Sequence, residues 1–254
     1  MRNACLGCLR AAGAIGAVVF LVIAGYSTEP TDSPKPSEYA PIADLASQVT
    51  RYLRAIDEDL ASGSDYDADH KNRILLNANT LIVLGRTIAQ HDESNDIKLA
   101  APALIESASA LAGSYDDYDS AVKAAGGLKE AVKKKSGGQI DESIAPSLSA
   151  LMKQVPIVNN DLRRGVNGKR FDRLIDDNAG HAATLAAIAH VSMSCSDYCS
   201  DAESQVKWAR VCADMRKAAT EVRTAVRRKD LPSATSGLAN LVKTCDQCHE
   251  SFRN

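Results

Sequence analysis

Residues 205–229 read QVKWARVCADMRKAATEVRTAVRRK, and this stretch decides the fold class. Its apolar residues recur in alternating steps of four and three, which predicts one long helix with a single apolar face. These residues are Trp208, Cys212, Met215, Ala219, Val222 and Val226. A seam of this kind is typical of helices that pack around the centre of an antiparallel bundle.

The same helical period runs through most of the chain from Pro41 onward, with short turn signals between the periodic segments. The turn signals lie at residues 62–64, 91–95, 113–119, 136–139, 165–168, 194–200 and 229–232. They delimit about eight helices, four on each side of the Ser136-Gly137-Gly138 break. The composition agrees, because alanine, leucine and charged residues dominate and aromatic residues make up only 4%. We therefore predict an all-α protein made of two tandem antiparallel four-helix bundles.

The two halves of the chain resemble each other as a degenerate tandem repeat. Placing Ser120-Ala121 over Ser233-Ala234 brings Leu128 over Leu241. The repeat predicts one bundle over residues 41–138 and a second bundle over residues 139–254.

The first 40 residues differ in composition from the rest. Arg2 and Arg10 precede the uncharged run AAGAIGAVVFLVIAG at residues 11–25. This order predicts a signal peptide or an N-terminal membrane anchor at residues 1–25, although the run is shorter than the roughly 20 residues of a spanning helix. Residues 26–40 are rich in Ser, Pro and Thr and are predicted to be a linker. We expect a periplasmic or otherwise exported protein, with or without a membrane anchor.

The chain ends with TCDQCHESFRN at residues 244–254, which contains the pattern Cys-x-x-Cys-His. Two thiols about one helical turn apart can add to the two vinyl groups of a haem, and the adjacent His can then bind the iron. The sequence therefore predicts haem c as the cofactor. Cys245 and Cys248 would form the thioethers, and His249 would be the proximal iron ligand.

Other chemistries share parts of this pattern. A thioredoxin-like redox pair needs an α/β context, and the sequence gives no sign of one. A zinc site could draw on Cys195, Cys199, Cys245, Cys248 and His249, but a His directly after the second Cys is unusual for zinc. A disulfide among Cys195, Cys199 and Cys212 stays an open alternative to buried free thiols.

With these residues in view, the second half resembles the cytochrome c′ superfamily of four-helix-bundle c-type cytochromes, including its low-spin Met/His members. The resemblance covers roughly residues 144–253. It rests on LMKQVP at 151–156, W-x-x-x-C-x-x-M at 208–215 and C-x-x-C-H-x-x-F-R at 245–253. It implies a haem packed between the helices of an antiparallel bundle.

The resemblance also implies Met152 as a sixth iron ligand, because the low-spin members take a methionine from their first helix. The alternative is that Met152 only fills space in the core, as most methionines do. His181 is a second candidate for the sixth position.

These observations predict a c-type cytochrome that carries one haem and transfers single electrons to a redox partner protein whose identity the sequence leaves open. One alternative is a five-coordinate haem protein that binds NO or CO, and Met152 distinguishes the two. Another is a helical adaptor that holds zinc in place of haem. We expect no enzyme, because no catalytic triad, phosphate loop or paired carboxylates stand out. The net charge of −2 gives no reason to expect nucleic-acid binding. A homodimer is compatible with the resemblance.

Overall fold

The computed structural model describes residues 34–135, 137–195 and 199–252. Every regular element in these ranges is helical, with nine α-helices and two short 3-10 helices, so the all-α prediction is confirmed. The predicted signal or anchor at residues 1–25 lies outside the described residues. In the part of the chain that is described, no helix is both long enough and apolar enough to cross a membrane.

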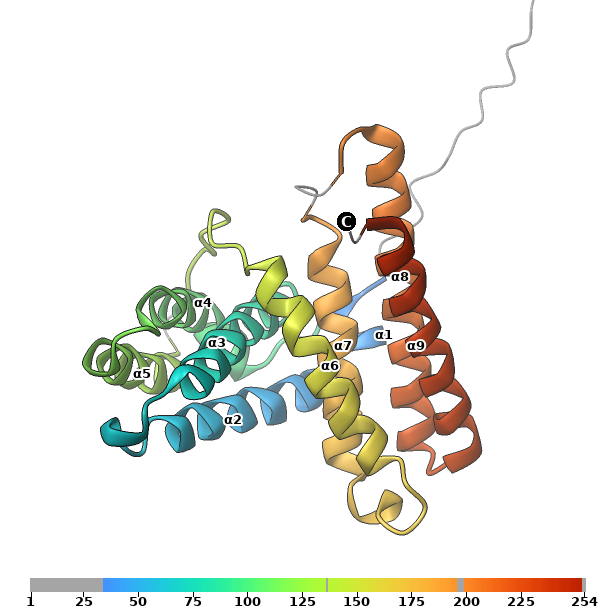
Figure 1. Ribbon diagram of the computed structural model, residues 1–254, viewed down its shortest axis with the longest axis horizontal. Coiled ribbons are helices and arrows are strands. Elements are labelled where there is room, and N and C mark those ends of the chain that lie inside the picture. Colours follow the sequence, from blue (N-terminus) through green and yellow to red (C-terminus); the bar gives the residue numbers. More distant parts are fainter. Residues whose placement is uncertain (1–33, 136, 196–198, 253–254) are drawn as a thin grey trace, which may run out of the picture. The chain divides into compact units, whose positions relative to one another are not determined.

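Five of the α-helices belong to the first half of the chain (Figure 1). They are α1 (Pro36–Tyr39), α2 (Ile42–Asp59), α3 (Ala68–Ala89), α4 (Asp96–Ser114) and α5 (Tyr118–Lys133). An Asp or Asn caps the N-terminus of α3, α4 and α5, and its side chain accepts hydrogen bonds from backbone N–H groups of the first turn. These three caps are Asp67, Asn95 and Asp117, and such residues fix where a helix begins.

The second half forms the four remaining α-helices. They are α6 (Leu148–Gly165), α7 (Ile175–Ser192), α8 (Ala202–Arg227) and α9 (Leu231–Phe252). Each packs on the next along the chain, and Figure 1 shows α7, α8 and α9 side by side. Gly237 lets α9 approach α8 closely, because a Cβ atom there would lie 2.9 Å from the side chain of Val222. The helix that the sequence predicts over residues 205–229 is present as α8.

Part of the segment expected to be a linker, residues 26–40, is folded at its C-terminal end. Residues Pro36–Tyr39 form α1, and Tyr39 is only 2% exposed. Its ring lies 4.9 Å from the ring of His190 on α7. The Ser37 backbone N–H and hydroxyl donate to the carboxylate of Asp92 at 2.9 and 2.6 Å. The Tyr39 ring and the Asp92 carboxylate thus hold a polar, proline-containing segment against the rest of the chain.

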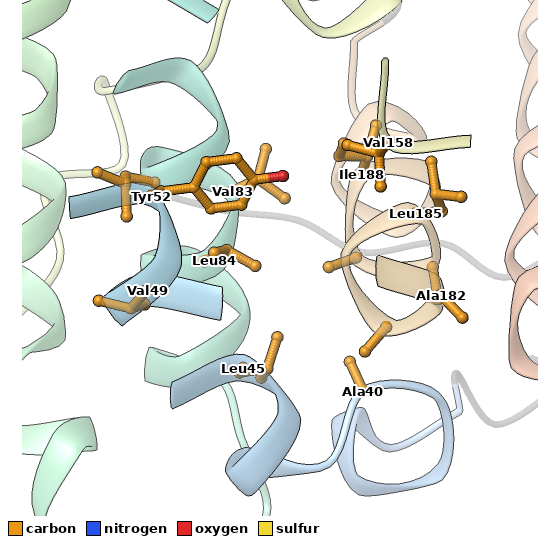
Figure 2. Close-up of a cluster of buried hydrophobic side chains, with 14 of the residues drawn as sticks. Ala40, Leu45, Val49, Tyr52, Val83, Leu84, Val158, Ala182, Leu185 and Ile188 are labelled. Atoms are coloured by element: carbon orange, nitrogen blue, oxygen red, sulfur yellow. The ribbon is translucent and has the colours of Figure 1, made fainter. Parts of the chain in front are cut away.

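The larger of two hydrophobic clusters extends across the boundary expected between residues 138 and 139. Helix α2 packs on α7, and α3 packs on both α6 and α7. Figure 2 shows Leu45, Tyr52 and Leu84 of the first half facing Val158 and Ile188 of the second. The chain from Pro34 onward is accordingly one compact unit. The first half therefore helps to position the helices of the second.

Candidate functional site

An apolar hollow of about 170 Å³ lies between the four helices of the second half. Its lining residues are Met152, Val155, Pro156 and Asn159 of α6, Ile188, Ala189 and Ser192 of α7, Trp208, Val211, Cys212 and Met215 of α8, and Val242, Thr244, Cys245, Cys248 and His249 of α9. The structure thus brings together at one hollow the four residues that the sequence singled out, which are Cys245, Cys248, His249 and Met152.

The two cysteines of the Cys-x-x-Cys-His motif lie about one turn apart on α9. Both are half-buried free thiols, and burial raises the pKa of each above its ordinary value. The Cys245 Sγ donates a weak hydrogen bond to the carbonyl of Leu241 at 3.5 Å. His249 follows directly and is exposed, at the border of the hollow. The motif therefore has its sulfur atoms against the apolar wall and its imidazole at the solvent edge.

Met152 is a partly buried residue of α6 on the wall of the same hollow. Pro156 follows one turn later and has no N–H, so it cannot donate to the Met152 carbonyl in the helical pattern. The start of α6 is fixed by the first half of the chain, because the backbone N–H of Ser147 donates to Asn79 of α3 at 2.6 Å. The first half therefore sets the place of the helix that carries Met152.

Trp208 is a large, buried residue on the α8 wall. Its indole N–H donates to the carbonyl of Ser192 at 2.7 Å, and its ring meets Phe252 edge-on with centroids 5.2 Å apart. The helical period predicted that Trp208 lies on the inner seam of α8. Its hydrogen bond to the Ser192 carbonyl could not be predicted, because a backbone carbonyl has no characteristic pattern in the sequence. Trp208 ties α7, α8 and α9 together beside the hollow.

Cysteine and methionine side chains pack in one cluster with Trp208, among them Cys212, Cys248, Met152 and Met193. Cys212 is 6% exposed, and its pKa is raised to about 12, chiefly by burial and further by the nearby thiols of Cys248, Cys195 and Cys199. Cys199 and Cys212 are free thiols. Among the described residues, no group of three or more Cys, His, Asp or Glu side chains is arranged to hold a metal ion.

His181 does not line this hollow. It is 4% exposed in the middle of α7 and lines a different cavity, on the side of α6 that faces the first half. Of the two residues that the sequence offered for the sixth position, only Met152 lies at the hollow of the Cys-x-x-Cys-His motif.

Comparison of this chain with protein-family models, with curated proteins and with solved structures finds no match. The nature of the site is therefore argued from its own residues.

The donor set of the hollow fits a covalently held haem. Two thiols one turn apart suit the two vinyl groups, the adjacent imidazole suits the iron, and the apolar wall suits the macrocycle. The hollow is smaller than the roughly 300–1,000 Å³ of a typical ligand pocket, so part of a macrocycle would extend toward the exposed His249. Two polar atoms at the hollow, Asn159 Oδ1 and Ser192 Oγ, are buried without a hydrogen-bond partner. Unpaired polar atoms in an otherwise apolar wall are typical of a place that a ligand completes.

Proposed function

We propose that this protein is an exported c-type cytochrome that carries one covalent haem c and transfers single electrons. The observation that supports it best is the placement of Cys245, Cys248 and His249 around an apolar hollow between four helices. When bound, the haem supplies an iron that changes reversibly between two oxidation states. In this proposal the second half is an antiparallel four-helix bundle around the haem, and the first half is a second, haemless bundle fused to it.

The residues of the hollow have separate roles in this proposal. Cys245 and Cys248 hold the macrocycle through thioethers, which prevents loss of the haem outside the cytoplasm. His249 would be the imidazole ligand of the iron. Met152 would be its thioether ligand, and thioether ligation would raise the reduction potential and favour electron transfer.

A second candidate function is binding of a diatomic gas such as NO or CO at a five-coordinate iron. It is favoured by the side chain of Asn159, which lines the hollow on the same helix as Met152. Its amide nitrogen would supply an N–H donor for a diatomic ligand in the hollow. The two functions differ in whether Met152 occupies the sixth position.

The test is to produce the full chain together with a haem c maturation system and to look for haem that survives denaturing electrophoresis. We expect covalent haem in the wild type and none in the double variant Cys245→Ser/Cys248→Ser. The matched control is Cys199→Ser, which removes a thiol close to Cys212 but outside the hollow lining. The control should retain the haem. A wild-type chain without covalent haem, or one purified with an equivalent of zinc, would overturn the proposal.

A further inference from the structure

A second cavity, of about 220 Å³, lies where α2 and α3 of the first half meet α6 and α7 of the second. Helix α6 separates it from the apolar hollow: Gln154, Ile157, Val158 and Asp161 face the second cavity, whereas Met152, Val155, Pro156 and Asn159 face the hollow. These two sets occupy opposite faces of one helix, as the period of 3.6 residues requires. The two cavities differ in character, because most of the residues that line the second one are polar or charged.

The inner wall of this cavity carries a buried imidazole that lacks a partner. His181 is 4% exposed, and its Nδ1 has no hydrogen-bond partner. Burial, and then the positive charge of Arg51, lower the pKa of His181 to about 4, so the ring is neutral near pH 7. A neutral imidazole has one N–H donor and one nitrogen acceptor. Leaving such a group unpaired in the interior is costly, and this is a reason to expect a polar occupant.

Tyr52 and Gln154 lie on the same inner wall, and both are almost fully buried. The Gln154 amide donates to the Tyr52 hydroxyl across 3.5 Å, which is a long and weak hydrogen bond. Figure 2 shows the Tyr52 ring extending from α2 toward the side of Val158. Burial raises the pKa of Tyr52 to about 12, so its hydroxyl remains a donor at neutral pH. The inner wall therefore presents several uncharged hydrogen-bonding groups at a short distance from each other.

The outer wall carries charges of both signs. Arg51 Nη2 lies 3.2 Å from Asp161, and Arg73 Nε donates to Asp59 at 2.7 Å. Each guanidinium has five N–H groups, so both keep N–H groups that these ion pairs do not use. A simple anion would meet the carboxylates of Glu58, Asp59 and Asp161, and a simple cation would meet the two guanidinium groups. A molecule with a carboxylate and an ammonium group can place each charge next to its opposite.

We propose that this cavity binds a small zwitterion of the α-amino-acid class. Its carboxylate would contact Arg51 and Arg73, its ammonium group would contact Asp161, and its side chain would reach Tyr52 and His181. The cavity is smaller than the roughly 300–1,000 Å³ of pockets for drug-sized ligands, which agrees with a ligand of this size. The first half would thereby have a binding role that does not depend on haem in the hollow.

The experiment titrates the purified full-length chain with L-serine and L-glutamine as zwitterions. Sodium acetate, methylammonium chloride and glycerol serve as the anionic, cationic and neutral probes. Binding is followed by the thermal unfolding midpoint and by the ¹H–¹⁵N signals of the His181 imidazole. We expect a saturable rise of the midpoint and a shift of the His181 signals with at least one amino acid, and neither effect with the other probes.

Variants identify the binding residues. Arg51→Met should weaken amino-acid binding by about tenfold, since it removes a charged hydrogen-bond donor. Arg54→Met is the matched control on the same helix, because Arg54 is 70% exposed and does not line the cavity. Its ion-pair partner Glu58 does line the cavity, but that side chain is 72% exposed, so the pair is a solvent-screened surface contact. The Arg54→Met control should bind like the wild type. If Arg51→Met does not fold, Tyr52→Phe is used in its place. We expect Tyr52→Phe to weaken the binding of an amino acid whose side chain contacts the Tyr52 hydroxyl.

The outcomes separate this inference from the proposed haem function, because the haem-free double variant Cys245→Ser/Cys248→Ser should bind the amino acid as the wild type does. An equal response to acetate would overturn the zwitterion assignment. If none of the probes moves the His181 signals, or if neither Arg51→Met nor Tyr52→Phe weakens binding, the cavity holds water only and the proposal is wrong.

Discussion

The carboxylate of Asp44 on α2 accepts a hydrogen bond from Arg223 Nε on α8 at 2.6 Å, and the Asp44 side chain is only 2% exposed. Arg227, one turn further along α8, donates to the other carboxylate oxygen and also contacts Asp176 at the start of α7. This cluster joins the first half of the chain to two of the helices that line the apolar hollow. The two halves are thus held together by charged groups as well as by the shared core.

Loss of the Asp44 carboxylate should destabilise the whole fold. Asp44→Asn leaves Arg223 largely buried without a counter-charge, and breaking a buried pair in this way costs about 3 kcal/mol or more. Asp57→Asn on the same helix is the control, since Asp57 and Lys129 form a pair in which both side chains are nearly half exposed. The control should change the free energy of unfolding by less than about 1 kcal/mol. Urea denaturation measures both variants, and equal effects would show that the buried cluster contributes no more than a surface pair.

Trp208 should report directly on the occupant of the hollow. It is the sole tryptophan of the sequence and lies on the wall beside the Cys-x-x-Cys-His motif. Haem absorbs where indole emits, so covalent haem should quench the tryptophan fluorescence strongly relative to the Cys245→Ser/Cys248→Ser variant. Unfolding the haem-loaded chain in guanidinium should restore most of the emission. Undiminished emission in a folded, haem-loaded chain would place the haem away from the hollow, and bound zinc would not produce the quenching.

Replacement of Met152 by leucine should open the iron to carbon monoxide. Leucine is close to methionine in volume, so Met152→Leu removes the thioether sulfur with little change in packing. We expect a low-spin reduced spectrum that resists carbon monoxide in the wild type and a high-spin, carbon-monoxide-binding spectrum in the variant.

The control for this substitution is Met215→Leu, at the other methionine of the hollow, which should leave the spectrum unchanged. If Met215→Leu gains carbon monoxide binding and Met152→Leu does not, Met215 is the sixth ligand. A wild type that binds carbon monoxide readily would favour the gas-binding function.

The long helices α2 to α9 and the residues that meet at the hollow could be predicted from the sequence for a common reason. Trp208, Cys212 and Met215 recur with the helical period, and this period alone turns them to one face. The same period places Cys245 and Cys248 on the inner side of the last helix. Features with a local pattern of this kind can be found without a structure.

Features that depend on pairing between distant segments could not be predicted in this way. The contact of Asp44 with Arg223 joins two helices far apart in the sequence, and neither residue is unusual for its position. The burial of Tyr39 and the second cavity around His181 likewise follow from the packing of the first half on α6 and α7. The sequence indicated that His181 lies on a helix near an apolar face. It did not indicate which of the two cavities His181 would line.

The buried state of His181 should make stability depend on pH. Its pKa is about 4 in the folded chain against 6.5 for an ordinary histidine, chiefly because burial penalises the charged ring. Between these values the unfolded chain binds a proton that the folded chain does not, so stability falls as the pH is lowered from 6.5 toward 4. The shift corresponds to about 3 kcal/mol at full extent. We therefore expect the free energy of unfolding of the wild type to fall by about this amount more than that of His181→Gln over this range. Urea denaturation at pH 7, 6, 5 and 4 measures the difference, and parallel curves for the two proteins would mean that His181 is protonated as readily in the folded chain as in the unfolded one.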